Sequence, residues 1–468
     1  MQNFETHTCK DQMDRLIRIA NASAFWGDRP SAAATLLQQV PDLDYITLDY
    51  LAEVSLSIMA IQREKNPTLG YAKDFIETIR SLVPFWKKGS KVKIIANAGG
   101  LNPFGCAQEC AKILKSTGCV HLKIGIVTGD DVLSILLKSP ENFHNLETHA
   151  SIETISPKLV TANAYLGASA IVEALQKGAD IVITGRVADP SLTVAPAAFH
   201  FGWDLQDYDL LANATIAGHL IECGTQATGG ILTDWLDLPA SEMIGFPIIE
   251  MDQKGHFTLT KPPHTGGIVN LPVIKEQLLY EIGDPGSYLS PDVNVSFLNI
   301  QLQEEAPNRV RVSGGKGSPP PTSYKVSATY KNGYRADGLL TIIGRDADKK
   351  ARKCGTIILE RVKQAGYNLQ DSLIECIGAG DATLGIIPQG ACTECVLKVS
   401  AADENREALE CFVKEFAPLV TSGPQGTTGY LTGRPKILPV FGYWPCLIDT
   451  KDVTPRTQTY AVEQLCTN

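Results

Sequence analysis

Three side chains between positions 219 and 223 have types and spacing that suit proton transfer. His219, Glu222 and Cys223 stand at positions i, i+3 and i+4, so a helix would place them on one face. A histidine beside a glutamate is a natural proton-transfer pair, and a cysteine becomes a nucleophile when a nearby histidine lowers the pKa of its thiol. We therefore predict catalytic roles for all three. A histidine on a partly apolar helix is also commonly a buried structural residue, so that role stays open for His219.

Arg186 and Asp189 follow an abrupt break in an apolar run. The run at 180–183 stops at Thr184 and Gly185, and the charged residues come next. A guanidinium group can bind a carboxylate or a phosphate through two parallel hydrogen bonds. The alternative is an ion pair between Arg186 and Asp189 that stabilises the loop. Both residues are predicted to belong to the catalytic site.

Two adjacent carboxylates, Asp130 and Asp131, follow the apolar run at 121–127. Neighbouring carboxylates raise the pKa of one of the pair, which suits a general base at neutral pH, and they can also bind a metal ion. Capping of a helix start is the competing role. We predict that Asp130 is the base, with Glu222 as the alternative, and the presence of a metal ion stays unknown.

Apolar runs that alternate with helix-like segments must position these groups. Continuous apolar strands separated by helices are typical of a parallel sheet covered by helices on both faces. Right-handed crossovers bring the carboxyl ends of such strands to one edge, where ligands bind. A (βα)₈ barrel would use the same edge, but too few units are visible, so we predict an α/β fold with an open, Rossmann-like parallel sheet. The predicted strands are residues 15–21, 44–49, 91–96, 121–127 and 180–183.

Polar side chains that follow these strands are predicted to bind the substrate. Basic residues in glycine-rich loops could contact a phosphorylated ligand, because free backbone N–H groups favour anions. Tight turns that need a positive φ angle are the alternative interpretation of these loops. The nucleotide-binding patterns GxxxxGK[ST] and GxGxxG, the hydrolase pattern GxSxG and the zinc-protease pattern HExxH are all absent from the sequence. The predicted binding residues are Asn21, Ser23, Asp49, Glu53, Asn97, Asn102, Lys316 and Arg434.

The length of 468 residues exceeds one ordinary core, so we predict two domains with a connection between them. The parallel-sheet domain covers residues 15–235 and includes an alanine-rich helix over 164–177. Residues 236–292 are rich in proline and glycine and are predicted to form an irregular connection or lid. Residues 293–450 alternate apolar and polar positions, with a turn at 331–333, and are predicted to form an α+β domain with antiparallel strands.

Composition favours a globular enzyme in the cytoplasm. The formal charge is −9, and we find no clustered basic face that would indicate a nucleic-acid partner. The sequence contains no apolar run of about 18 residues, so no membrane span is expected. The N-terminal segment does not resemble a signal peptide. The 12 irregularly spaced cysteines favour reduced thiols, and neither Cys392 with Cys395 nor Cys106 with Cys110 makes a four-ligand zinc site. A homo-oligomer is expected, because such assemblies are common among large soluble enzymes.

Several longer stretches of the chain look familiar together. They are ASAFWGD (22–28), LDYLAEVSLSIM (48–59), NAGGLNP (97–103), TGRVADPSL (184–192), HLIECGTQATGG (219–230), TGGIV (265–269), YEIGDPGSYLSPDV (280–293), SGPQGTTGY (422–430) and YWPCLID (443–449). Over residues 15–450 the chain resembles the core of the acyclic terpene utilisation, or AtuA-like, family. Longer members carry a small ferredoxin-like domain after this core, and we expect that domain to be absent here.

The resemblance implies a role in the breakdown of branched isoprenoid acids, with an acyl-CoA thioester or a carboxylic acid as substrate. Our first hypothesis is a hydratase, dehydratase or carbon–carbon lyase without a tightly bound cofactor. Asp130 or Glu222 would be the base, His219 would relay protons, and Arg186 and Asn97 would hold the acyl oxygens. The alternatives are an isomerase or cyclase of a terpenoid or polyketide-like metabolite that does not use coenzyme A, and a non-catalytic subunit of an acyl-CoA catabolic complex.

Overall fold

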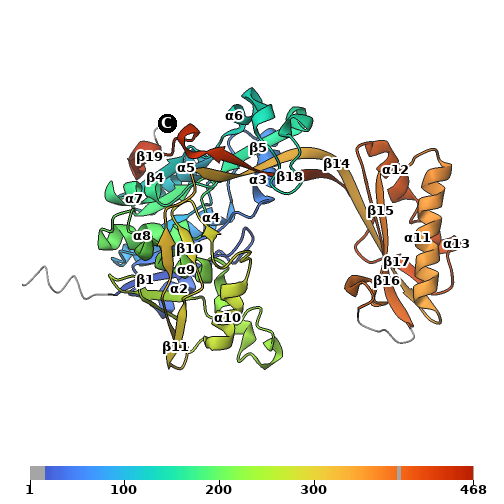
Figure 1. Ribbon diagram of the computed structural model, residues 1–468. Coiled ribbons are helices and arrows are strands. Elements are labelled where there is room, and N and C mark those ends of the chain that lie inside the picture. The colour runs from blue at the N-terminus through green and yellow to red at the C-terminus, as the bar shows by residue number, and fades with distance from the viewer. Residues whose placement is uncertain (1–15, 387–391, 467–468) are drawn as a thin grey trace, which may run out of the picture. The chain divides into compact units, whose positions relative to one another are not determined.

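The computed structural model describes residues 16–386 and 392–466, which form two compact units (Figure 1). The first unit contains the chain up to residue 329 and again from residue 443, and the second unit contains residues 330–442. The sequence analysis placed the start of the second domain at residue 293, whereas residues 293–329 belong to the first unit. Residue 15, where the first predicted strand begins, lies outside the described residues.

Five parallel strands form the centre of the first unit. They are β1 (Ile17–Asn21), β2 (Tyr45–Leu48), β3 (Lys93–Ala96), β4 (Lys123–Thr128) and β6 (Ile181–Thr184). These are the five strands predicted from the apolar runs, and they pair in the order β1-β2-β3-β6-β4. The register aligns Ile46, Ile94 and Ile181 across three of them. Because parallel strands end at the same edge, the residues that follow each strand meet there.

Antiparallel strands extend this sheet on both sides, so the sheet is open and mixed rather than purely parallel. The added strands are β19 (Arg456–Ala461) beside β4, and β7 (Ile248–Met251), β8 (Phe257–Thr260), β12 (Arg309–Ser313) and β11 (Gln301–Ala306) beyond β1. Residues 236–292, predicted to be irregular, supply β7, β8 and helix α10 (Leu271–Leu279). That prediction is wrong because these elements are short and the residues between them are rich in proline and glycine, a pattern that also indicates loops.

Helices cover both faces of the parallel strands (Figure 1). On one face α2 (Ala32–Gln39), α4 (Asp74–Lys87) and α5 (Pro103–Ser116) share a buried core with strand residues such as Leu48 and Ile94. On the other face lie α7 (Ser169–Gln176), α8 (Ser191–Phe201) and α9 (Tyr208–Glu222). Alternation along β2 explains the division, since Tyr45 contacts His200 of α8 while its neighbour Ile46 faces the first core. Each buried isoleucine or leucine contributes about 1.5–3 kcal/mol to this packing.

The alanine-rich segment predicted as one helix over 164–177 is split. Strand β5 (Leu159–Ala164) pairs with β14 (Ser323–Ile343), and α7 begins only at Ser169. Gly167 explains the break, because a Cβ atom there would lie 2.4 Å from Asp292 Oδ1. The same carboxylate accepts a hydrogen bond from Ala168 N at 2.7 Å. Tertiary contacts to Asp292 therefore override the helix propensity of the alanines.

A small sheet and several short helices complete the first unit. Strand β10 (Asn294–Ser296) pairs antiparallel with β9 (Tyr288–Leu289) and with β13 (Lys316–Ser318). Side chains of β9 line a cavity at the edge where the parallel strands end. The remaining elements are α3 (Ser55–Lys65), α6 (Leu133–Lys138), α14 (Val462–Leu465) and β18 (Ile437–Asp449), which returns the chain from the second unit.

The second unit has the strand-helix-strand-strand-helix-strand order of a ferredoxin-like fold. Its elements are β14, α11 (Ala347–Gln364), β15 (Asp371–Ile377), β16 (Glu394–Asp403), α12 (Arg406–Lys414), the short α13 (Leu419–Ser422) and β17 (Thr427–Tyr430). The strands pair antiparallel in the order β15-β16-β14-β17. Ile358 and Phe412 of the helices pack against Leu397 and Val399 of β16. A ferredoxin-like unit therefore lies inside this chain, within the region predicted to be α+β with antiparallel strands.

The hairpin turn predicted at 331–333 is wrong, because β14 runs through these residues as a continuous strand. Gly333 has a positive φ of 73° and would bring a Cβ atom to 2.7 Å from Asp403 O. The glycine therefore permits a close approach to the end of β16 rather than a reversal of the chain.

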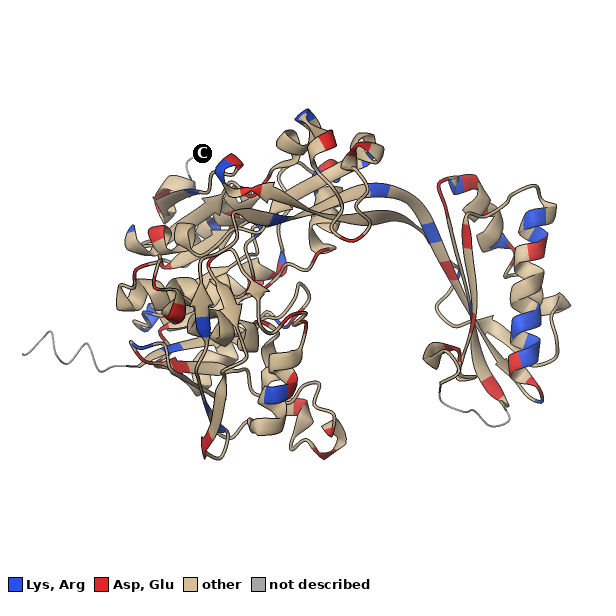
Figure 2. Ribbon diagram, in the orientation of Figure 1, with Lys and Arg blue, Asp and Glu red and all other residues tan. Residues whose placement is uncertain are grey.

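Basic residues gather near the start of α11, whereas charges of both signs are interspersed over the first unit (Figure 2). No such cluster of basic residues was predicted from the sequence. Arg352 has its charge matched locally, since it makes two hydrogen bonds to the Asp381 carboxylate at 2.6 and 2.9 Å. The other basic residues of this group are Lys349, Lys350 and Lys353.

Candidate active site

A cavity of about 800 Å³ lies in the first unit, at the edge where the parallel strands end. Residues that follow β2 and β6 form one side of it, and α9 with the segment after α10 forms another. Strand β9 and the start of β14 complete the lining. The structure thus brings together predicted residues from separate parts of the chain: Asp49, Glu53, Arg186, Asp189, His219, Glu222 and Cys223.

Asp130 lies behind the cavity, where it binds the backbone of Arg186. Its Oδ2 accepts hydrogen bonds from Arg186 N at 2.8 Å and from Asn163 Nδ2 at 2.7 Å. Gly185 is needed here, because a Cβ atom at this position would lie 2.3 Å from Asp130 Oδ1. Burial raises the pKa of Asp130 to about 6, although the hydrogen bonds act in the opposite direction. Asp130 is not among the residues that line the cavity, so its geometry fits a positioning role better than that of the predicted base.

Replacing Asp130 with asparagine is expected to remove a pH-dependent part of the stability. Folding raises the pKa of Asp130 to about 6, above its value of about 3.9 in an unfolded chain. The group therefore stabilises the fold below about pH 4, and this contribution is lost as the pH rises through about 6. At about 1.4 kcal/mol per pKa unit, the loss amounts to about 2–3 kcal/mol.

Urea unfolding at about pH 4.5 and about pH 8 measures this difference. The Asp130→Asn variant should lose less stability between the two conditions than the unsubstituted chain, and Asp237→Asn, at an exposed aspartate away from this contact, should behave like the unsubstituted chain. An identical pH dependence in Asp130→Asn would contradict the buried carboxyl group.

The side chain of Arg186 is buried, with 2% of its surface exposed, and lines the cavity. Its Nη1 donates to Leu51 O at 2.8 Å and to Asp189 Oδ1 at 2.9 Å, and its Nη2 donates to Asp189 Oδ2 at 3.4 Å. The ring of Tyr165 lies 4.0 Å from the guanidinium carbon. Burial alone lowers the pKa of the guanidinium group, but Asp189 and Tyr165 outweigh it and raise that pKa, so Arg186 stays charged. The ion pair with Asp189 is therefore formed, while Arg186 Nε keeps no hydrogen-bond partner among the described residues.

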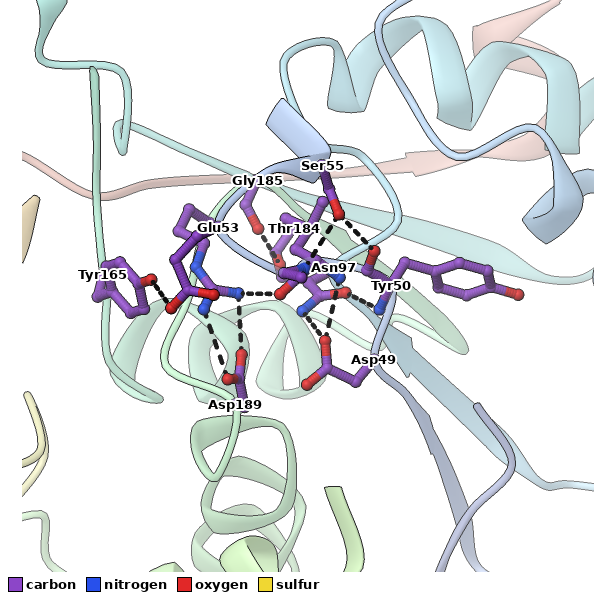
Figure 3. Close-up of polar contacts among 12 residues, drawn as sticks. Asp49, Tyr50, Glu53, Ser55, Asn97, Tyr165, Thr184, Gly185 and Asp189 are labelled. Carbon is purple, nitrogen blue, oxygen red and sulfur yellow. Dashed lines mark hydrogen bonds and ion pairs between the residues drawn. The ribbon is translucent and has the colours of Figure 1, made fainter. Parts of the chain in front are cut away.

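Glu53 and Tyr165 connect this arginine to the rim of the cavity (Figure 3). The Tyr165 hydroxyl donates to Glu53 Oε1 at 3.3 Å. Lys325 Nζ lies 4.0 Å from the same oxygen and 5.1 Å from the Tyr165 ring. Because this ion pair is long and half exposed, Lys325 is free to meet a second anion.

His219 and Glu222 share a hydrogen bond on α9. His219 Nδ1 lies 3.2 Å from Glu222 Oε1, and His219 Nε2 lies 3.1 Å from Gln277 O in α10. A carbonyl oxygen can only accept, so Nε2 carries the proton that it donates. In a neutral imidazole Nδ1 is then the acceptor, and Glu222 must donate as a protonated carboxylic acid.

The surroundings favour this neutral pair over an imidazolium–carboxylate ion pair. The Tyr288 ring lies 6.1 Å from that of His219, and burial lowers the pKa of His219 to about 4. Burial, followed by the charges of Asp189 and Glu281, raises the pKa of Glu222 well above its usual range. Glu222 Oε2 has no hydrogen-bond partner in the described part of the chain. The carboxylic acid therefore presents one free oxygen at a residue that lines the cavity.

Cys223 lines the cavity at the end of α9 as a neutral thiol. Burial raises the pKa of this thiol, and the charges of Glu222 and Glu281 raise it further. Because Nδ1 of His219 is already engaged by Glu222, it is not placed to lower that pKa. The thiolate is the reactive form, so the surroundings do not favour the predicted nucleophilic role.

Asn97 holds Asp49 in place (Figure 3). Its Nδ2 donates to Asp49 Oδ1 at 2.7 Å, and its Oδ1 accepts from Tyr50 N at 2.6 Å. Burial, followed by the charge of Asp189, raises the pKa of Asp49 well above its usual range. A second carboxyl group with a raised pKa therefore lines the cavity beside Arg186.

Asn21 and Ser23 connect the end of β1 to the same site. Ser23 Oγ donates to Asp49 O at 3.1 Å, and Asn21 Nδ2 donates to Glu222 O at 3.4 Å. Neither residue is part of the cavity lining, and the same holds for Asn97. Their geometry thus fits the support of other side chains better than the predicted contact with substrate.

A match over nearly the whole chain identifies the protein family. A family model described as acyclic terpene utilisation family protein AtuA matches residues 17–459. The chain belongs to this family. The match confirms the resemblance read from the sequence and links the AtuA-family chain to terpenoid metabolism. Neither the curated proteins nor the solved structures contain a match to it.

Three further predicted binding residues of this AtuA-family chain lie outside the cavity lining. Asn102 caps α5, where its Oδ1 accepts from Gly105 N at 2.9 Å. Lys316 binds Asp209 at 2.7 Å on the surface. Arg434 belongs to the second unit and is exposed. The lining of the AtuA-family cavity therefore includes neither of the two basic residues predicted to bind phosphate.

Sequence reasoning missed cavity residues that come from irregular segments. Glu281 follows α10 with a φ of 59°, a left-handed conformation that is uncommon for a residue other than glycine. Tyr288 lies on β9, and Lys325 lies near the start of β14. The only signal for the first two was the segment 280–293, which contributed to the resemblance. Lys325 stands in an alternating strand pattern that carries no chemical signal of its own.

Residues 16–386 and 392–466 of the AtuA-family chain contain neither a candidate membrane helix nor a cluster of metal ligands. No helix in these ranges has both the length and the apolarity that a bilayer crossing requires. No three histidine, cysteine, aspartate or glutamate side chains in these ranges are grouped as ligands for a metal ion.

Proposed function

We propose that the chain is an acid–base enzyme that adds water to, or removes water from, a methyl-branched isoprenoid acid or its thioester. The observation that carries this proposal is the hydrogen bond between Glu222 Oε1 and His219 Nδ1 at 3.2 Å, in which the carboxyl group is the donor because His219 Nε2 donates to Gln277 O. A carboxylic acid that retains its proton at neutral pH is a general acid. The family's link to acyclic terpene utilisation supplies the substrate class.

Protonation of a branched double bond provides the chemical step. Rotation of the Glu222 carboxyl group turns its O–H from His219 Nδ1 into the cavity. This O–H bond breaks as the proton adds to the less substituted carbon, and the neighbouring tertiary carbon becomes cationic. A water oxygen then bonds to that carbon, and the proton that the water releases returns to the Glu222 carboxylate. Dehydration follows the same path in reverse. Carboxylates such as Asp189 and Glu281 and the face of Tyr288 line the cavity and stabilise the positive charge that develops.

The acyl end of the substrate belongs near the basic residues of the lining. Lys325 Nζ lies 4.0 Å from Glu53 Oε1, and the buried Arg186 adds a second positive charge to the lining of the same cavity. A carboxylate or a thioester carbonyl can accept a hydrogen bond from Lys325 Nζ. Carbon–carbon lysis fits less well, because it requires a base to remove a hydroxyl proton, whereas Glu222 already carries its proton.

Replacing Lys325 with glutamine is expected to raise KM for an isoprenoid acid about tenfold, because one charge-assisted hydrogen bond is lost. The kcat should change little, since Lys325 lies at the acyl end and not at the reacting carbon. The corresponding alcohol should show no change in KM. Steady-state kinetics on both compounds measures this contrast, with Lys138→Gln, at an exposed lysine of α6, as the matched control. An equal effect on acid and alcohol would contradict a headgroup contact.

The reaction itself is tested by incubating the purified chain in D₂O with unsaturated, methyl-branched terpenoid acids, their alcohols and their coenzyme A thioesters. Mass spectrometry should detect the gain of one D₂O in the product. A product that has gained no water but carries one exchanged deuterium would favour an isomerase. The same proton donor supports that candidate. Failure to transform any compound would count against both.

A further inference from the structure

A second cavity, of about 530 Å³, lies in the first unit and shares no lining residue with the active-site cavity. Arg18, near the start of β1, lines it, whereas the other end of β1 leads to the active site through Asn21. Strands β7 and β8 and the segment after β8 provide half of the remaining lining. The two cavities therefore have separate linings.

Two arginines and two carboxylates in this cavity neutralise one another. Glu250 is buried and lies 2.9 Å from Arg18 and 2.6 Å from Arg309. Arg18 also pairs with Asp42. These four side chains carry two positive and two negative charges, so they leave no net charge for a ligand to match.

Lys261 is the remaining cation of the lining, and its charge is unmatched. It is 8% exposed, and no carboxylate within the described residues pairs with it. Its Nζ donates to Thr265 O at 2.6 Å and to Thr265 Oγ1 at 3.2 Å, which leaves one N–H available. Burial lowers the pKa of Lys261, as expected for a buried ammonium group without a counter-ion. An anion in the cavity would relieve this cost.

The rest of the lining is largely apolar and contains two residues with left-handed backbone. His264 and Asn308 both line the cavity with left-handed φ angles of 60° and 58°. Non-glycine residues in this conformation are uncommon and cluster where ligands are bound. The apolar side chains of the lining are Val40, Pro41, Ile248, Pro262, Pro263 and Pro307.

We propose that this second cavity binds a small organic monocarboxylate, with the carboxylate on Lys261 Nζ and the apolar body against the proline-rich lining. One unmatched positive charge selects a monoanion, and the apolar lining selects an organic acid over inorganic phosphate. This site stands independently of the reaction proposed for the active-site cavity.

The test is photolabelling of the full chain with a short carboxylic acid that carries a diazirine, followed by mass spectrometry of the peptides. Labelling is expected on peptides that contain residues 260–264 or 307–309, and 3-methylbutanoate should compete for it. Lys261→Met should reduce this labelling about tenfold, as expected for one charge-assisted hydrogen bond. Lys261→Arg should retain it. Lys254→Met, at an exposed lysine of the preceding turn, should leave it unchanged.

Two competitors keep the proposal falsifiable even if Lys261→Met fails to fold, which circular dichroism would reveal. The neutral 3-methylbutanamide should compete at least tenfold less well than 3-methylbutanoate. Inorganic phosphate should compete weakly. Equal competition by the amide or by phosphate would overturn the proposal, as would undiminished labelling of a folded Lys261→Met variant.

Discussion

Replacing Glu222 with glutamine is expected to lower kcat about 10²–10⁴-fold, the usual contribution of a general acid. The amide can still donate a hydrogen bond to His219 Nδ1, so the fold and the histidine tautomer should persist. It has no acidic proton to give to a double bond or to a hydroxyl leaving group. The loss should therefore appear in kcat, with KM almost unchanged.

The pH profile gives this prediction a second readout. Burial and the charges of Asp189 and Glu281 raise the pKa of Glu222, so the acid form persists to a higher pH than that of an ordinary glutamate. The kcat should then be lost as the pH rises through that raised pKa, and the glutamine variant should lack this limb. Glu276→Gln, which alters a glutamate of α10 outside the cavity lining, is the matched control. Turnover by Glu222→Gln at the original rate would remove Glu222 from the mechanism.

The second large effect is expected from Arg186→Met, which should lower the free energy of unfolding by about 3 kcal/mol. Methionine fills much of the volume, but Leu51 O and the Asp189 carboxylate lose their partner. Asp189 is 31% exposed, so water relieves part of the cost, and the estimate lies at the lower end for a broken buried ion pair. Urea unfolding measures this loss.

Three variants separate the role of Arg186 from a general loss of charge. Arg186→Lys should restore little, because a single ammonium group cannot bond Leu51 O and both Asp189 oxygens together. Arg186→Met combined with Asp189→Asn should recover part of the stability, since no carboxylate is then left unpaired. Arg345→Met, at an arginine that is 96% exposed, should have no measurable effect. Equal stability of Arg186→Met and the unsubstituted chain would contradict the buried ion pair.

The central parallel strands were predictable because each is a mostly apolar run, a pattern that few other structures produce. Strands covered on both faces need continuous apolar runs, and β6, which contains residues 181–183 of the predicted run, is buried at every residue. Strands β7 and β8 are equally buried and equally short, but they stand among prolines and glycines instead of helix-like segments. Short apolar sequences in that setting do not distinguish strands from loops, so the mixed character of the sheet could not be predicted.

Placement at a strand end was enough to nominate Arg186 and Asp189, and helical spacing nominated His219 and Glu222; all four line the cavity. Placement at a strand end also nominated Asn97 and Asn102, and a glycine-rich loop nominated Lys316, but the structure uses these three for other contacts. Placement at a strand end brings a residue to the edge, but its side-chain direction depends on partners that are distant in sequence. Asp209, which binds Lys316, is one such partner.

By itself the sequence determined the family, the five parallel strands and the spacing that places His219 and Glu222 on one helical face, because these depend on local pattern and composition. The tertiary structure alone decided which of them holds the proton. That assignment depends on Gln277 O, which lies 58 positions from His219 and obliges Nε2 to donate. It depends also on burial against residues from other elements, which raises the pKa of Glu222. Hydrogen-bond direction and desolvation arise only when distant segments pack together, so no local pattern could have supplied them.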